Sequence, residues 1–147
     1  MSVRLVIDAA ECTGCRICEI SCSFHHEGAI WPARTGITIT AQSDDGPFVP
    51  IVCLQCKTHG LTEGDEPPCA ASCPEGAITW DARSGTWVVN LEECIGCSIC
   101  AEACRYGGMV FDDGQGVPCK CDLCGGEPEC GIMCPSGAIL AVSIGGR

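Results

Sequence analysis

The sequence has few of the residues that build large protein cores or bind polyanions. Its 147 residues include three Trp, three Phe and one Tyr, so large aromatic side chains contribute little to a core. Lys and Arg together number eight against nineteen Asp and Glu, which gives a formal net charge of −11. Nucleic acids require clustered positive charge, so we expect no nucleic-acid ligand. A protein partner with a basic docking face is favoured instead.

Long apolar segments are also missing. No stretch approaches the roughly 18 consecutive apolar residues of a transmembrane helix, so we expect no direct membrane insertion. The opening residues, MSVRLVIDAAEC, have neither the apolar core nor the cleavage site of a secretory signal. We therefore expect a cytoplasmic protein whose thiols stay reduced.

Cysteine is abundant, with seventeen in the chain. A small chain with a thin core needs cross-links, which are either disulfides or bound metal. Because clustered cysteines in a reducing compartment are typically metal ligands, the metal interpretation is favoured over a disulfide scaffold.

One cysteine motif occurs twice, as ECTGCRICEISC at 11–22 and ECIGCSICAEAC at 93–104. Both copies space their cysteines by three, three and four residues. This run resembles the iron–sulfur motif of bacterial-type ferredoxins, in which the fourth cysteine binds the neighbouring cluster. The cysteines of the two copies are Cys12, Cys15, Cys18 and Cys22, and Cys94, Cys97, Cys100 and Cys104.

A second motif is also repeated, with two cysteines three apart, an insert, then two cysteines four apart and a Pro. Its endings are CPEGAI at 73–78 and CPSGAI at 134–139. Sixteen of the seventeen cysteines fall into the four motifs, which fits four cubane 4Fe–4S clusters with four thiolates each. Zinc or a three-iron centre at one site is the alternative, and Cys119 is the cysteine in excess. The second motif comprises Cys53, Cys56, Cys69 and Cys73, and Cys121, Cys124, Cys130 and Cys134.

The segments between the motifs predict short strands in an α+β fold. We expect a strand at 3–8, a hairpin from ITITAQ and PFVPIV, and two strands across a turn at about 81–85. Another strand and turn follow Cys104, and ILAVSI closes the chain as a strand. Residues 57–68 are predicted to form a surface loop.

Other residue types receive minor roles. Trp80 and Trp87 are interpreted as packing residues. His25 and His26 are interpreted as polar residues beside a cluster, with ligation as the alternative, and His59 in the loop is a weaker candidate ligand. No nucleophile–base arrangement or dinucleotide-binding motif is present, so we expect a protein without catalytic residues.

Over nearly its whole length the chain resembles the four-cluster ferredoxin-type electron-transfer subunits of anaerobic redox complexes. The resemblance rests on the four cysteine motifs, CPEGAI, CPSGAI and KCDLC (120–124). Members include iron–sulfur subunits of the dimethyl sulfoxide reductase family, carriers linked to carbon monoxide dehydrogenases, and small subunits of tungsten aldehyde oxidoreductases. The stretch CSFHHEGAIWPAR (22–34) looks most similar to the tungsten-enzyme and dehydrogenase carriers.

The resemblance implies a single compact polyferredoxin of two ferredoxin-like dicluster modules, with short helices and small antiparallel sheets. The first and last motifs would close around the central module, giving module one as 1–52 plus 115–147 and module two as 53–114. Spacing alone also allows motif one to pair with two and three with four. The ligand sets of the nested arrangement are Cys12, Cys15, Cys18 and Cys134; Cys121, Cys124, Cys130 and Cys22; Cys53, Cys56, Cys69 and Cys104; and Cys94, Cys97, Cys100 and Cys73.

The function implied is electron transfer through four 4Fe–4S clusters. One partner would be a catalytic oxidoreductase subunit, with a tungsten- or molybdenum-dependent aldehyde oxidoreductase as the best match. The other would be an external carrier or second redox subunit, such as a flavin subunit or a ferredoxin, and copies of the chain could also associate with one another. The alternatives are a free-standing soluble polyferredoxin and, more remotely, a redox sensor or structural cluster module.

Overall fold

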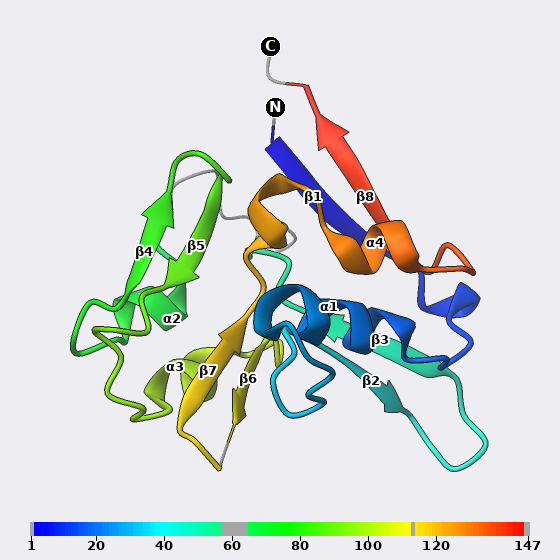
Figure 1. Ribbon diagram of the computed structural model, residues 1–147, viewed down its shortest axis with the longest axis horizontal. Coiled ribbons are helices and arrows are strands. Elements are labelled where there is room, and N and C mark those ends of the chain that lie inside the picture. The colour runs from blue at the N-terminus through cyan, green and yellow to red at the C-terminus, as the bar shows by residue number, and fades with distance from the viewer. Residues whose placement is uncertain (1, 57–64, 113, 146–147) are drawn as a thin grey trace.

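The computed structural model describes residues 2–56, 65–112 and 114–145, and it has the predicted α+β class. Four two-stranded antiparallel sheets alternate with short helices (Figure 1). Residues 57–64 of the predicted loop, including His59, lie outside the described residues. The elements are β1 (Ser2–Ile7), α1 (Ile17–Glu27), β2 (Ile37–Ala41), β3 (Phe48–Val52), α2 (Pro68–Ala71), β4 (Ile78–Asp81), β5 (Thr86–Val89), α3 (Ile99–Ala103), β6 (Met109–Asp112), β7 (Val117–Lys120), α4 (Glu129–Met133) and β8 (Ile139–Ile144).

The two ends of the chain form one sheet. β1 pairs with β8 in antiparallel register from Ser2 opposite Ile144 to Ile7 opposite Ile139. Figure 1 shows the two strands side by side, with both termini at the same end of the sheet. This pairing places the motif that follows β1 beside the motif that precedes β8.

The other three sheets are local hairpins. Two were predicted as pairs of strands, and for the third the sequence predicted one strand and a turn but not β7. In β2–β3, Pro50 lies opposite Ile39, which is tolerated because a two-stranded sheet has only edge strands. In β4–β5, Trp80 lies opposite Trp87 with ring centroids 5.9 Å apart, in agreement with a packing role. The third hairpin joins β6 and β7.

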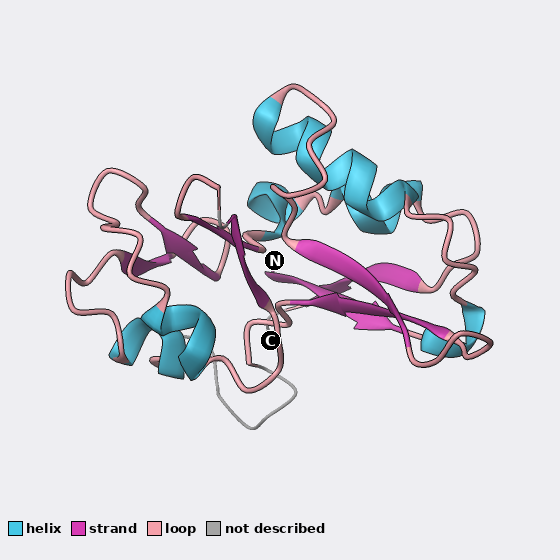
Figure 2. Ribbon diagram, turned by 90° about the horizontal axis from the view of Figure 1, so that it is seen from below, coloured by secondary structure: helices cyan, strands magenta, loops and turns pink. Residues whose placement is uncertain are grey.

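The helices pack in two pairs, α1 against α4 and α2 against α3. Figure 2 shows the two groups of helices on opposite sides of the strands. α1 is the longest helix at eleven residues, and it ends at Gly28, whose φ of 67° lies in the left-handed region. Glycine adopts this conformation without steric cost, which makes it a favourable helix terminator.

Buried side chains form two separate clusters, and both clusters contain cysteines. The first cluster comprises Leu5, Cys18, Cys22, Ile37, Ile39, Val52, Leu123, Cys130 and Ile139. The second comprises Cys69, Ala70, Ile78, Cys100 and Met109.

The part of the chain that the structure describes contains no helix long and apolar enough to cross a membrane.

Candidate metal centres

The cysteine motifs fold into loops that curl tightly before entering a helix. The corresponding Gly14 and Gly96 have φ of 71° and 72°, and Arg16 and Ser98 have 60° and 59°. Residues in this left-handed region turn the backbone sharply, so that cysteines three residues apart face a common centre. All seventeen cysteines lie in the described residues, and none of them forms a disulfide.

The structure brings two predicted ligand sets together around small cavities. The first set, here named site I, lines one cavity together with Ile39, and it joins motif one to motif four. The second, site IV, lines a separate cavity together with Phe111. Site I consists of Cys12, Cys15, Cys18 and Cys134. Site IV consists of Cys73, Cys94, Cys97 and Cys100.

A third predicted set lines a larger cavity of about 270 Å³ between the two halves of the molecule. We name it site II. The cavity wall includes Val88 and Val89 from β5, so a strand of the central hairpin covers thiols of the terminal motifs. Site II consists of Cys22, Cys121, Cys124 and Cys130.

The fourth predicted set, site III, lines two adjoining cavities. Three of its thiols line one of these cavities, and Cys69 joins two of the same thiols in the other. The pKa of Cys69 is raised to about 11, mainly by burial; Lys120 opposes this rise, and the charges of the other three thiols of the set contribute to it. The four thiols therefore lie close enough to repel one another when ionised. Site III consists of Cys53, Cys56, Cys69 and Cys104.

Burial also raises the pKa of other site cysteines, to about 12 for Cys18 and Cys130 and to about 11 for Cys124. A thiol must lose its proton to bind a metal, so metal binding has to supply that free energy. Cys134 differs. Burial opposes its ionisation, but hydrogen bonds from the Ser136 hydroxyl and from the backbone N–H groups of Ile139, Ser136 and Ala138 together outweigh burial and lower its pKa.

Backbone N–H groups donate to several of these sulfur atoms. The N–H of Ala77 lies 3.3 Å from Cys73 Sγ. The N–H of Gly36 lies 3.3 Å from Cys22 Sγ, between motif one and β2. Donors of this kind stabilise the negative charge of a thiolate, and they are a main determinant of iron–sulfur potentials.

Two histidines and the cysteine outside the four motifs also lie near site II. His26 Nε2 is 3.9 Å from Cys124 Sγ and 3.4 Å from Asp122 Oδ1, and His25 Nδ1 is 3.7 Å from Glu129 Oε1. The ligand atoms of His25, His26 and Cys124 lie within 4.8 Å of one another, so both histidines lie beside a candidate ligand. Cys119 lines the site II cavity, and burial raises its pKa.

Sequence reasoning missed three polar residues that connect these sites. Glu19 is buried in α1, where its carboxylate accepts the Ile39 N–H at 2.6 Å. Gln55, beside Cys56 of site III, hydrogen-bonds the carbonyl of Cys121 of site II and the ammonium group of Lys120. Lys120 stands in the KCDLC motif and could have been noticed there, but no pattern in the sequence marks Gln55 or Glu19.

The donor chemistry of the four sites fits iron–sulfur clusters. Each site offers four thiols and no carboxylate among its predicted ligands. Soft thiolate sets select iron–sulfur clusters or zinc over magnesium or calcium. The ferredoxin-like spacing favours iron–sulfur clusters over zinc.

Known proteins agree with this chemistry. Residues 52–108, which include motifs two and three, match the family model of the 4Fe-4S dicluster domain. The polyferredoxin-like subunit of an aliphatic sulfonate oxidoreductase from Pyrococcus furiosus is 38% identical over 132 residues, covering 90% of this chain and 71% of the relative. Electron transport protein HydN of Escherichia coli is 32% identical, covering 97% of this chain and 89% of its own.

A solved structure is similar over the same length. It is the active site complex BamBC of benzoyl coenzyme A reductase with 1,5-dienoyl-CoA, at 25% identity and a TM-score of 0.51. The match covers 99% of this chain and 79% of the chain in that complex. The chain therefore belongs to the family of non-catalytic iron–sulfur electron-transfer subunits that contain 4Fe–4S dicluster domains.

Proposed function

We propose that the chain holds one 4Fe–4S cluster at each of sites I–IV and transfers electrons along them in that order. The observation that carries this proposal is that each predicted set of four thiols lines one cavity or two adjoining cavities. When bound, each cluster accepts and donates one electron with little rearrangement. The protein positions the thiolates, excludes water from them and donates N–H groups to their sulfur atoms.

Shared helices support the order of the sites within each half. Cys18 of site I and Cys22 of site II lie one turn apart on α1. Cys100 of site IV lies in α3, and Cys104 of site III caps the end of the same helix. Each helix therefore joins two neighbouring sites.

The junction between the halves supports the step from site II to site III. The charge of Cys53 contributes to the raised pKa of Cys121, after the larger effect of burial. The side-chain amide of Gln55 also donates to the Cys121 carbonyl at 2.6 Å. Sites II and III are therefore the inner pair, and sites I and IV are the ends.

Exposure of the thiols supports the same layout. Cys15 in site I and Cys97 in site IV are the two exposed cysteines among the seventeen, all of which are described. We propose that these two positions are where electrons enter and leave. The nested module boundaries, 1–52 plus 115–147 and 53–114, are part of this proposal, and the two separate buried clusters support them.

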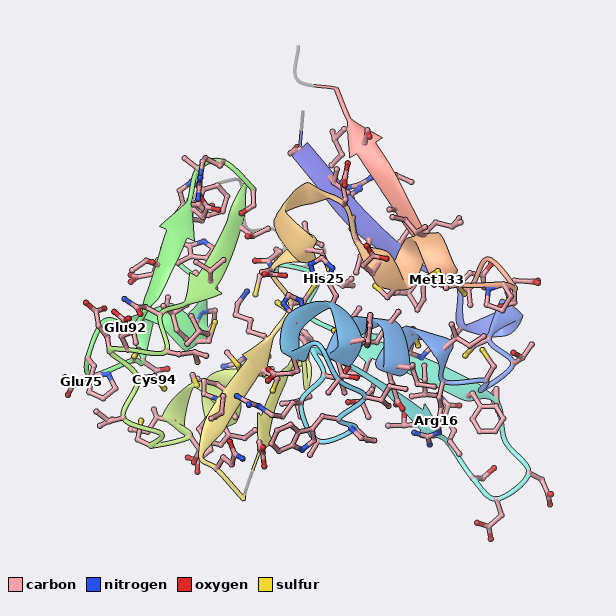
Figure 3. All side chains as sticks on the ribbon, in the orientation of Figure 1. Arg16, His25, Glu75, Glu92, Cys94 and Met133 are labelled. Carbon is pink, nitrogen blue, oxygen red and sulfur yellow. The ribbon has the colours of Figure 1, made fainter. Side chains whose placement is uncertain are left out.

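The two ends differ in surface chemistry. Ile95, which lines the site IV cavity together with Cys97, is 64% exposed. Glu75, Glu92 and Cys94 lie together at that end of the molecule, and Arg16 lies at the other (Figure 3). The site IV end suits a partner with a basic rim. At the site I end the Arg16 guanidinium is paired with Glu19, so this end has a different docking surface and we expect a different partner there.

We propose a catalytic oxidoreductase subunit as one partner, and the sulfonate oxidoreductase relative supports this choice. A tungsten- or molybdenum-dependent aldehyde oxidoreductase remains our specific candidate, with a flavin subunit or ferredoxin at the other end. A cytoplasmic location belongs to the same proposal. The alternative is a free-standing polyferredoxin, which the near-complete coverage of electron transport protein HydN favours.

Anaerobic purification of the tagged chain from its native host tests both versions. The subunit proposal expects a stoichiometric complex with a catalytic chain and about sixteen iron atoms per copy of this chain. Recovery of the chain alone with the same iron content would favour the free carrier. About four or eight iron atoms per chain would contradict the four-cluster assignment.

A further inference from the structure

Lys120, at the end of β7, lies where the two halves of the molecule meet. Its ammonium group donates to Gln55 Oε1 at 3.0 Å, to the Trp87 carbonyl at 2.5 Å and to the Cys121 carbonyl at 3.4 Å. These three acceptors come from three separate segments of the chain. Because an ammonium group has three N–H donors, every donor has an acceptor and the side chain is held in place.

Gln55 completes this network from the site III side. Its Oε1 also accepts the Trp87 N–H at 3.1 Å, and its Nε2 donates to the Cys121 carbonyl. The residue itself is buried and has φ of 57°, so its backbone is turned to bring the side chain to the junction. Gln55 therefore links motif two, β5 and motif four around the ammonium group.

The acceptors around Lys120 are all uncharged oxygen atoms. Among residues 2–56, 65–112 and 114–145, no carboxylate lies within ion-pair distance of its ammonium group. Candidate ligand thiols lie near it, and they become anionic when they bind metal. Burial raises the pKa of Cys56 and Cys69 in site III and of Cys121 in site II. The positive charge of Lys120 lowers the pKa of all three thiols and so partly offsets this rise.

We propose that Lys120 is an electrostatic positioning residue for electron transfer between sites II and III, an inference that rests on the proposed function. Reduction of either site adds one negative charge, and a fixed cation between them stabilises that added charge. The step itself moves one electron, oxidising one site as the other is reduced, and it moves no proton. Lys120 therefore raises the reduction potential of the two inner sites relative to the two end sites.

Redox titration of the purified chain, followed by electron paramagnetic resonance, tests this inference. Lys120→Met removes the charge and keeps most of the length of the side chain, whereas Lys120→Arg keeps a charge. Arg83→Met is the matched control, because Arg83 is 95% exposed on the β4–β5 turn. We expect Lys120→Met to lower the potential of two of the four reduction steps, Lys120→Arg to restore them towards wild type, and Arg83→Met to shift none.

Iron content is measured first, so that the two proposals fail separately. Wild-type protein without four clusters overturns the proposed function, whereas four clusters with unchanged potentials in Lys120→Met overturn the role of Lys120. An equal shift of all four steps also overturns it. If the Lys120→Met protein loses clusters, Gln55→Glu serves as the test variant, because a carboxylate at position 55 neutralises the ammonium charge while Lys120 itself is kept. That variant must lower the same two potentials for the inference to stand.

Discussion

The terminal and central halves of the molecule have the same local structure although the chain connects them differently. In the central half, β4 and β5 are joined by the turn at 81–85, and motif three follows. In the terminal half, β8 and β1 pair without a covalent connection, and motif one follows. The Asn90 N–H donates to the Ala77 carbonyl at 2.7 Å, and the Asp8 N–H donates to the Ala138 carbonyl at 2.8 Å. Each half therefore surrounds its cysteines with the same framework.

This comparison shows that packing around the thiols, and not chain connectivity, defines the module. Leu5 and Ala141 stand opposite each other at the positions that Trp80 and Trp87 occupy in the other half. The central half can close early because its strands are a local hairpin. The terminal half closes only after its last strand is available, which carries a larger loop-closure cost. We therefore expect the terminal half to be the less robust of the two.

The largest expected effect comes from changing the cysteine that links neighbouring sites. Cys22→Ser should remove about four of about sixteen iron atoms and empty site II, while site I keeps its own ligands. Cys104→Ser should do the same to site III. Iron analysis with spectroscopy of the remaining clusters measures both. Cys119→Ser is the control, and loss of iron in that variant would contradict its assignment as the spare cysteine.

A smaller effect is expected from weakening the sheet that closes the terminal half. Leu5 is 5% exposed in this sheet, so Leu5→Ala should destabilise the half by about 2–5 kcal/mol. Guanidinium titration of iron release should show sites I and II losing iron before sites III and IV. Val6→Ala, on the same strand but 40% exposed, is the control. Simultaneous release from all four sites would show that the halves are not separate in stability.

The sequence predicted two of the hairpins and the four cysteine motifs because both depend on local spacing, whereas the nested pairing of the motifs came from the resemblance. The β4–β5 turn follows from turn-forming residues between apolar strands, and the curled cysteine loops follow from Gly14 and Gly96. The roles of Glu19 and Lys120 could not be predicted in this way. Glu19 accepts a hydrogen bond from a residue twenty positions away, and Lys120 contacts Gln55 across 65 positions. Such contacts depend on tertiary packing, and no repeating pattern in the sequence indicates them.

Glu19 gives a third way to compare the halves, because the equivalent position in the central half is Ala101. Glu19→Ala leaves the buried Ile39 N–H without its acceptor and Arg16 without its ion-pair partner. We expect the free energy of unfolding to fall by about 1–3 kcal/mol. The midpoint of guanidinium unfolding measures this change. Glu102→Ala, at an exposed position in α3, should change stability by less than about 0.5 kcal/mol.

The smallest expected effect is a difference in stability between alanine variants of two glycines at the same motif position. A Cβ on Gly96 would lie 2.8 Å from the Gly116 carbonyl oxygen, which is backbone, whereas a Cβ on Gly14 would lie 2.5 Å from the Phe48 ring. Both alanine variants also bear the left-handed backbone cost of about 1–2 kcal/mol. Because a side chain can be removed, Phe48→Ala should recover about 1 kcal/mol of the loss in Gly14→Ala. If Phe48→Ala restored as much stability to Gly96→Ala as to Gly14→Ala, the contact with Phe48 would not be the cause of the loss in Gly14→Ala.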